Sequence, residues 1–464
     1  MRMRMRFWGR MPVADFSTTA PDGRSHPSRD RAERPARILA AMFQGGGNIP
    51  LLMPVMERLV ERGHRLRIMA GPGVRRSRLP VSGSLVQRVS ASGATLVPFQ
   101  EPGPHPYEGA PPLKGLVGGW VPRPFKGIQS ETQTFLWASA WAQNVAAELR
   151  QEPADLLIAD FVLFGALAAA EATRIPSVAL MHTVAIRPLA GLPPYGTGWS
   201  PAQGIVGALR NAAGRAVLQR LHRRNSLPHL NAARAALGLP PLRSEFEQYD
   251  RASRVLMLVS SAFDYPARAL PSNMEHVGTP VEDAAAQLGE SPWSNERRGR
   301  RLILVSLSSL NQGQAPILHR VLLAVARLDV RAIVTVGPSL NASEFVVPSN
   351  VQLEKFVPHS AILPHVDALV TQCGIGTLTK GLLAGIPLVC LPIVGDQPDN
   401  AARVSAHGAG IHLPTDASPE QIGAAIERVL GDPKYKEAAQ RLKAAMLGGG
   451  DPVDRAVAAI EGAF

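Results

Sequence analysis

The segment 370–400 has the residue types and spacing of an anion-binding site. A buried strand is expected to end at Thr371. Gly374 and Gly376 then provide an open loop, and a helix is expected to begin near Thr377. Unpaired main-chain N–H groups and the helix macrodipole both favour a phosphate at the start of a helix. The sequence therefore predicts that this helix start binds a phosphorylated ligand.

Other kinds of phosphate and metal chemistry are not supported by the sequence. No Gly-Lys-Ser/Thr triplet occurs, so a Walker loop for NTP hydrolysis is not expected. No Asp-x-Asp pair is present to carry a phosphate-bridging metal. The two cysteines, Cys373 and Cys390, have no zinc-site spacing, and we interpret them as core thiols of a protein in a reducing cytoplasm. We expect neither a metal nor a cofactor.

A second glycine-rich loop, at 45–47, follows the apolar run 38–42. Apolar residues at helical spacing follow it over 51–60, and 64–69 is expected to be the next strand, so the chain begins as a β-α-β unit. Two interpretations of the glycines stay open. They form a tight turn, or they bring bare N–H groups close to a ligand. Since the loop contains no acid or base, it supplies backbone and space.

Composition limits the class of protein. At 464 residues, two domains are expected. No apolar run approaches the ~18 residues of a membrane-spanning helix, so we expect a soluble, cytoplasmic protein. Five of the twelve excess positive charges lie at the N-terminus, where residues 1–37 hold nine Arg against four acidic residues. We interpret 1–36 as a disordered basic tail. Aromatic residues make up only 5%, without a platform for stacking bases, so nucleic-acid binding is not expected.

Short apolar strands alternate with helical segments along the rest of the chain, which predicts two parallel, doubly wound α/β sheets. The polar, aperiodic stretch 281–300 is expected to link a domain at 37–280 to one at 301–464. Two Pro/Gly-rich stretches, 100–128 and 186–203, are expected at the carboxyl edge of the first sheet, where open α/β sheets bind ligands. In the second domain we expect strands at 302–305, 331–336, 351–353, 368–371 and 388–391, helices at 315–327 and 376–384, and helices after 417.

The second half resembles the nucleotide-sugar signature of the inverting, metal-independent UDP-glycosyltransferase superfamily, and of bacterial natural-product glycosyltransferases with a GT-B fold in particular. The matching residues are Phe356-Val357-Pro358-His359, the Thr-x-x-Gly-x-Gly-Thr loop at 371–377, Gly385-x-Pro387, Pro392, Asp396-Gln397 and Asn400. Weaker similarity extends over 37–464. The resemblance implies two Rossmann-like domains that face a central cleft, the first for an acceptor and the second for a nucleotide sugar.

The resemblance also assigns donor-site roles. Phe356 would stack on the nucleobase, and the main chain of Val357 would bond to its edge. The diphosphate would be held by Gly374, Gly376 and Thr377. Further donors to it would be Gln372, which replaces a His usual in the superfamily, and Ser309 and Gln312 in a loop that resembles the family's other diphosphate loop.

Asp396 and Gln397 would bind sugar hydroxyls, and a plain loop turn is the alternative for this pair. Lys380 stands where UDP-sugar users of the superfamily have a Glu that accepts from both ribose hydroxyls. Because a deoxyribose has no 2′-OH, Lys380 favours dTDP over UDP, unless it is a solvated helix residue.

Inverting transfer needs a base for the acceptor hydroxyl. In relatives this base is a His, and the matching position here is Gly47, in the predicted acceptor loop Gly46-Gly47-Asn48. A subgroup of bacterial relatives also has a Gly-Gly-Gly-Asn loop. Asn48 can only hydrogen-bond, so it would position the acceptor.

Two residues at strand ends are candidates for the missing base. Asp160 matches the Asp that orients the family's His, and it could act alone if burial beside Phe161 and Phe164 raises its pKa. His182 is expected at the same sheet edge, and the ordinary pKa of a His suits the task. A structural role is the alternative for His182.

The sequence thus predicts an inverting hexosyltransferase that moves a sugar from a dTDP- or UDP-sugar to a small, largely apolar acceptor such as a bacterial natural product. An antibiotic is one such acceptor. Two other functions stay open: a nucleotide-sugar epimerase on the same fold, and a noncatalytic nucleotide-sugar-binding auxiliary protein. A monomer or a homodimer is expected.

Overall fold

The computed structural model describes residues 35–43, 47–72, 83–100, 134–202, 204–281, 299–308 and 312–464. Most of the predicted tail, of the predicted linker and of the 100–128 stretch therefore lies outside the described residues. Two predicted site residues, Gly46 and Ser309, lie outside them as well.

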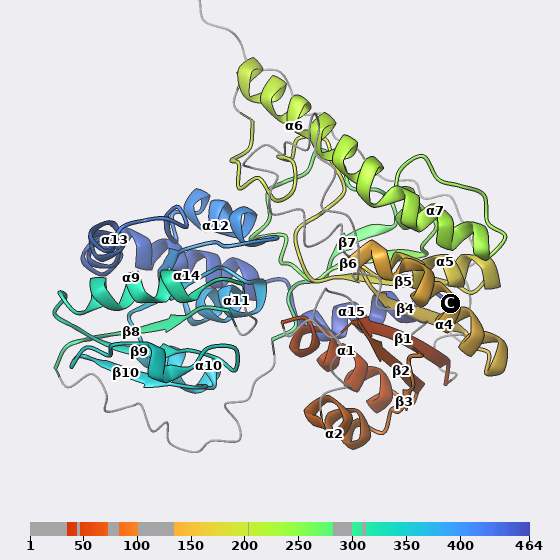
Figure 1. The fold of residues 1–464 in the computed structure, drawn as a ribbon, viewed down its shortest axis with the longest axis horizontal. Coiled ribbons are helices and arrows are strands. Elements are labelled where there is room, and N and C mark those ends of the chain that lie inside the picture. The colour runs from red at the N-terminus through yellow and green to blue at the C-terminus, as the bar shows by residue number, and fades with distance from the viewer. Residues whose placement is uncertain are drawn as a thin grey trace, which may run out of the picture. The chain divides into compact units, whose positions relative to one another are not determined.

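The first half of the described chain forms a seven-stranded parallel sheet with the order β3-β2-β1-β4-β5-β6-β7 (Figure 1). The order runs outward in both directions from β1 and β4, so their carboxyl ends flank the switch point at which doubly wound sheets bind ligands. The strands are β1 (Arg37–Phe43), β2 (Arg65–Gly71), β3 (Thr95–Val97), β4 (Leu156–Asp160), β5 (Ser177–Met181), β6 (Arg254–Met257) and β7 (Met274–His276).

Helices cover this sheet and fix the positions of the strand ends. Helix α1 (Ile49–Glu61) has Pro50 in its first turn, where a missing N–H costs nothing, and it buries its apolar face on the sheet. Helices α4 (Ala138–Gln151) and α5 (Phe164–Thr173) pack so closely that a Cβ at Gly165 would lie 1.9 Å from the Ala138 carbonyl oxygen. The remaining elements are α2 (Gly83–Ser92), η3 (Phe135–Trp137), α6 (Gly204–Asn225), α7 (Leu227–Ala236) and α8 (Glu247–Asp250).

The second half forms a six-stranded parallel sheet with the order β10-β9-β8-β11-β12-β13. Its strands are β8 (Arg301–Ser306), β9 (Val330–Thr335), β10 (Val351–Glu354), β11 (Ala368–Thr371), β12 (Leu388–Cys390) and β13 (Gly410–His412). Its helices are α9 (Ala315–Val325), η5 (Ala342–Glu344), α10 (His359–Ile362), η6 (Leu363–His365), α11 (Ile375–Ala384), α12 (Gln397–Ala406), α13 (Pro419–Gly431), α14 (Pro433–Leu447) and α15 (Pro452–Glu461). The two parallel sheets confirm the predicted α/β class.

The last helix, α15, packs against the first sheet rather than the second (Figure 1). Val457 and Ile460 are fully buried in the core that covers one face of β1 and β4. Glu461 accepts from Arg62 at 2.8 Å and lies 3.2 Å from the His64 ring. The last helix of the chain thus stabilises the N-terminal half, although it follows the second sheet in sequence. Among the helices of the described ranges, none is long and apolar enough to cross a membrane.

Candidate functional site

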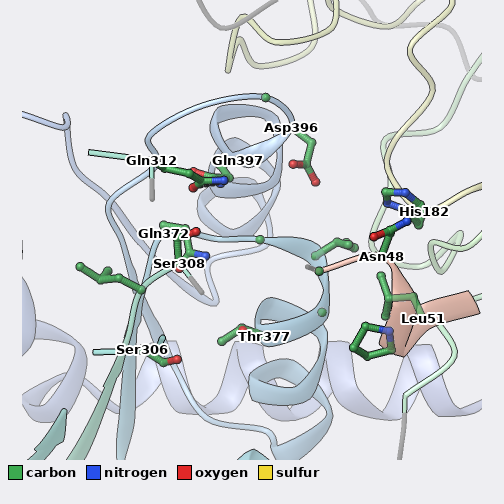
Figure 2. Close-up of a pocket in the computed structure, with 18 of the residues that line it drawn as sticks. Asn48, Leu51, His182, Ser306, Ser308, Gln312, Gln372, Thr377, Asp396 and Gln397 are labelled. Atoms are coloured by element: carbon green, nitrogen blue, oxygen red, sulfur yellow. Dashed lines mark hydrogen bonds between the residues drawn. The ribbon is translucent and has the colours of Figure 1, made fainter. Parts of the chain in front are cut away.

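A cavity of about 670 Å³ is lined by residues from both sheets (Figure 2). Its volume lies within the range of pockets for small organic ligands. The carboxyl ends of β1, β4 and β5 supply one wall, and the ends of β8, β9, β11 and β12 supply the other. Both walls are therefore built at the sheet edge that the doubly wound topology assigns to ligands.

The predicted phosphate loop lies at the second wall. Gly374 is the N-cap residue of α11, and because glycine has no side chain it does not cap the helix itself. Gly374, Gly376 and Thr377 all line the cavity. Cys373, just before them, has a φ of 67°, which is a strained value for a non-glycine residue and is typical of ligand-binding loops. The first turn of α11 is thus placed to receive an anion.

Gln372 adds a side-chain amide to this wall. It is 7% exposed, and its Oε1 accepts a hydrogen bond of 3.2 Å from the Thr371 hydroxyl. That bond fixes the amide so that Nε2 lies over Gly374, where an added Cβ would meet it at 3.3 Å. The four described residues predicted around α11 to hold the diphosphate therefore lie together.

The loop after β8 forms the other side of this corner. Gln312 lines the cavity, and its Oε1 accepts from Gln397 Nε2 at 2.9 Å. Gln397 Oε1 in turn accepts from the main-chain N–H groups of Ile393 at 2.8 Å and Val394 at 3.1 Å. Gln397 therefore braces the loop before α12 and also lines the cavity, and sugar binding by this residue stays a prediction.

His359 is a polar residue of this wall to which the sequence assigned no role. Its Nε2 lies 3.0 Å from Ser306 Oγ, which also accepts from Thr335 Oγ1 at 3.1 Å. Burial, together with the charge of Lys380, lowers the pKa of His359 to about 4, so its imidazole is neutral at neutral pH. The ring therefore offers the cavity a hydrogen-bonding group without charge.

The residues predicted to bind a nucleobase, Phe356 and Val357, lie at the same wall. Phe356 lines the cavity and is 75% exposed, an unusual state for a large aromatic residue. Val357 beside it is buried. Lys380, on α11, also lines the cavity. The exposed ring of Phe356 is thus free of protein packing that would block a stacked base.

At the first wall, Asn48 and Asp160 are bonded to each other. Asn48 Nδ2 donates to Asp160 Oδ2 at 2.9 Å and to the Phe43 carbonyl oxygen at 2.7 Å. Asp160 is 1% exposed and is absent from the lining of the cavity, whereas Asn48 is part of it. Gly47 also lines the cavity, and an added Cβ there would meet nothing within 4 Å, which fits a loop that supplies space.

His182 lies between two carboxylates. Its Nε2 is 3.3 Å from Asp160 Oδ2, within ion-pair distance but without aligned hydrogen-bond geometry. The ring meets Phe161 edge-on, with 4.8 Å between ring centroids. Burial would lower the pKa of His182, but the charges of Asp160 and then Asp396 more than offset it, and the pKa is raised. His182 lines the cavity, so it is the ionisable group of this pair that a ligand can reach.

Asp396 belongs to the second wall, at the side that faces His182 (Figure 2). Its Oδ2 accepts from Asn400 Nδ2 at 2.7 Å. Burial raises the pKa of Asp396, although the Asn400 bond and the charge of His182 act in the opposite direction. The charges of His182 on the first wall and Asp396 on the second wall thus interact with each other.

The cavity lining also includes residues that the sequence did not single out, among them Thr134 and Tyr195. Tyr195 lies within the Pro/Gly-rich stretch 186–203 that was predicted at this ligand-binding edge, so the composition located the stretch but not the side chain. Within the described ranges, no group of three or more His, Cys, Asp or Glu side chains is arranged to hold a metal ion.

Comparison with known proteins places the chain among glycosyltransferases. Residues 319–461 match the family described as erythromycin biosynthesis protein CIII-like, C-terminal domain. The 4′-demethylrebeccamycin synthase of Lentzea aerocolonigenes is 31% identical over 419 residues, which cover 88% of this chain and 95% of that protein.

Two solved structures show the same fold. The glycotransferase of kitacinnamycin has a TM-score of 0.69 at 22% identity, and the match covers 93% of this chain and all of that one. The glycosyltransferase VinC, solved in complex with dTDP, has a TM-score of 0.61 at 19% identity and covers 92% and 99% of the two chains. These matches confirm the predicted GT-B fold. Because the identity to the Lentzea protein extends over nearly the whole of both chains, this chain belongs to the UDP-glycosyltransferase family, glycosyltransferase family 1, and has an EryCIII-like C-terminal domain.

Proposed function

We propose that the protein is an inverting, metal-independent glycosyltransferase that moves a sugar from a dTDP-sugar to a small, largely apolar natural product. One observation carries the proposal: a single cavity has a glycine-capped helix start on one wall and, on the other, a histidine beside Asp160 whose pKa is raised by the charges of Asp160 and Asp396. The half at 37–280 would bind the acceptor and the half at 301–464 the donor. The chain would fall in the bacterial subgroup with a Gly-Gly-Gly-Asn loop.

The donor would lie along the second wall. The base would stack on Phe356, and the diphosphate would accept from the first-turn N–H groups of α11, from Thr377 and from the Gln372 amide. These hydrogen-bonding groups are already in place before the reaction. They would therefore stabilise the charge that develops on the leaving diphosphate without reorganisation of the protein. The Lys380 side chain lines the cavity and, as an ammonium group, cannot accept a hydrogen bond from a 2′-hydroxyl, which favours deoxyribose. The complex of the similar VinC contains dTDP.

His182 would be the general base. Of the two candidates, it is the one that lines the cavity, and its raised pKa makes it a stronger proton acceptor than an ordinary His. Asp160 would hold the ring and stabilise the imidazolium that forms when the acceptor hydroxyl loses its proton. The deprotonated oxygen would attack the anomeric carbon from the face opposite the diphosphate, which inverts the configuration. Asp396 would bind a sugar hydroxyl beside the reacting carbon.

The test is incubation of the protein with dTDP- and UDP-sugars, with and without a panel of polycyclic aromatic and macrolactone aglycones. A glycosylated aglycone, of inverted anomeric configuration by NMR, and unchanged turnover in EDTA are expected. Conversion of the sugar nucleotide alone would indicate an epimerase instead. Binding of the nucleotide sugar without any turnover would indicate an auxiliary protein.

A further inference from the structure

The loop after β5 is bonded to the helix that begins at the predicted sugar-binding pair. Asp399, in the first turn of α12, accepts from Gly196 N at 2.6 Å through one carboxylate oxygen and from Gly198 N at 2.8 Å through the other. Asp399 is 3% exposed. We call these two hydrogen bonds the Asp399 clamp. The clamp joins the acceptor half to the donor half at a point next to the cavity.

The backbone of the loop is fitted closely to α12. Gly198 has a φ of 65°, and a Cβ there would lie 2.9 Å from Pro398 Cβ and 3.1 Å from the Pro398 carbonyl oxygen. The Thr197 hydroxyl donates to the Pro194 carbonyl oxygen at 2.6 Å and so braces the turn from within. The clamp therefore fixes the loop as a unit, including Tyr195, which lines the cavity.

A second charged residue anchors α12 one turn further on. Arg403 is 4% exposed, and its Nη1 donates to the Asp399 carbonyl oxygen at 3.0 Å. Its Nε and Nη2 contact Asp264 Oδ1, after β6, at 2.8 Å and 2.7 Å. The guanidinium also lies over the Tyr265 ring, 4.2 Å from its centroid. Because Arg403 is already paired with Asp264, the oxygens of Asp399 remain available to the loop.

We propose that Asp399 is a positioning residue for sugar transfer, which holds Tyr195 and the acceptor wall in register with the helix that presents Asp396. The inference rests on the proposed function. Both oxygens of this buried carboxylate accept from main-chain N–H groups of the other half, so Asp399 has no free oxygen for a proton transfer and serves to position the loop. Since a misplacement of about 1 Å costs up to roughly a hundredfold in rate, release of this loop would act chiefly on the acceptor.

The test compares two variants that break the clamp from opposite sides with a matched control. Asp399→Asn keeps the size of the side chain but points an NH₂ group at one of the two glycine N–H groups. Gly198→Ala keeps Asp399 and pushes the loop off Pro398. Gly204→Ala is the control, because its φ of 63° imposes the same backbone strain and its added Cβ would meet nothing within 4 Å.

Three quantities are measured: hydrogen exchange of the peptide 192–202, the Kd for dTDP, and the KM for the aglycone that the wild-type protein glycosylates. Both clamp variants are expected to exchange faster in this peptide, to raise the aglycone KM by about tenfold or more, and to change the dTDP Kd by less than about twofold. Gly204→Ala should match the wild type in all three.

The proposal is overturned if exchange is unchanged in the clamp variants, if exchange rises without a change in aglycone KM, or if Gly204→Ala has the same effects. A wild-type protein that transfers no sugar would contradict the proposed function. The exchange measurement would still show in that case whether the clamp holds the loop.

Discussion

The Nε2 atom of His182 lies 3.3 Å from Oδ2 of Asp160, at the carboxyl ends of the neighbouring parallel strands β5 and β4. The same oxygen of Asp160 accepts from Asn48, at the end of the loop after β1. Three adjacent strands thus converge on one buried carboxylate. His182 and Asn48 line the cavity and Asp160 does not, so any effect of this carboxylate on a bound ligand would pass through these two side chains.

Replacement of His182 should remove the base. His182→Ala is expected to lower kcat by roughly 10²- to 10⁴-fold, the usual contribution of a general base, while the Kd for dTDP stays near the wild-type value. Asp160→Asn should lower kcat less, because the ring stays in the cavity. Steady-state kinetics and calorimetry check both. A larger loss in Asp160→Asn than in His182→Ala would show that Asp160 is itself the base.

The pH dependence of kcat should report the pKa of His182. The charges of Asp160 and Asp396 raise this pKa in spite of burial, and the base is active only when neutral, so kcat is expected to fall as the pH drops through the raised value. In Asp160→Asn the carboxylate charge is gone and burial remains. The pH at which kcat falls on the acidic side should therefore be lower in Asp160→Asn than in the wild type. An acidic limb at the same pH in both proteins would contradict the role of His182.

The second wall of the cavity was predictable because its geometry is local. A strand that ends at Thr371, two glycines and a helix at 375–384 follow one another directly in the chain, and the predicted helix start at 376 differs by one position. The helices predicted after 417 are also confirmed, and α13 and α14 begin at Pro419 and Pro433, where a proline in the first turn costs no hydrogen bond. Such features follow from the backbone preferences of a few neighbouring residues.

The rest depends on contacts that no local pattern encodes. The partners of Asp399 in the clamp are 203 and 201 residues away in the chain, in a Pro/Gly-rich loop without periodicity. Helix α6 was not predicted, because its apolar residues do not gather on one face and Ile205 and Val206 are exposed. The choice between Asp160 and His182 depended on which of two strand ends faces the cavity.

The exposed ring of Phe356 gives a clean test of the nucleotide site. Phe356→Ala should weaken dTDP binding by about 1–3 kcal/mol, which is the usual worth of a base stacked on an aromatic ring. Since the ring is 75% exposed, the free energy of unfolding should barely change. Calorimetry with dTDP and urea unfolding separate the two effects. Phe356→Tyr is the control and should bind dTDP as the wild type does. Equal dTDP affinity in Phe356→Ala would place the base elsewhere.

His359 should make stability fall on acidification. Burial and the charge of Lys380 lower its pKa from 6.5 to about 4 in the folded state. The unfolded chain therefore binds a proton first as the pH falls, and the stabilisation present above pH 6.5 is lost down to about pH 4. From pH 7 to pH 5 this group alone should cost about 2 kcal/mol of the free energy of unfolding.

Urea unfolding of the wild type and of His359→Gln at the two pH values measures this term. The glutamine in His359→Gln cannot be protonated. Between pH 7 and pH 5, the free energy of unfolding of this variant should therefore fall by about 2 kcal/mol less than that of the wild type. His319→Gln, at a histidine outside the cavity lining, is the control. Identical pH dependence in the wild type and His359→Gln would mean that His359 is not held neutral by the fold.

The Asp399 clamp should loosen below about pH 6. Burial raises the pKa of Asp399 to about 6, with a small further rise from Asp396, although Arg403 and the two loop N–H groups act in the opposite direction. Protonation turns one accepting oxygen into a hydroxyl, so hydrogen exchange in the peptide 192–202, corrected for its intrinsic pH dependence, should rise as the pH falls through about 6.

Global stability should not follow the same course. A carboxyl whose pKa is raised on folding takes up its proton first in the folded state, so protonation of Asp399 adds to the free energy of unfolding as the pH falls from 6 toward 4. Faster local exchange, without a contribution from Asp399 itself to the loss of global stability, is therefore the expected signature. The neighbouring Asp264, Arg403, Asp396 and Tyr265 are unchanged in Asp399→Asn, so the difference between that variant and the wild type isolates the clamp. A pH-dependent exchange that persists in Asp399→Asn would assign the transition to one of these neighbours.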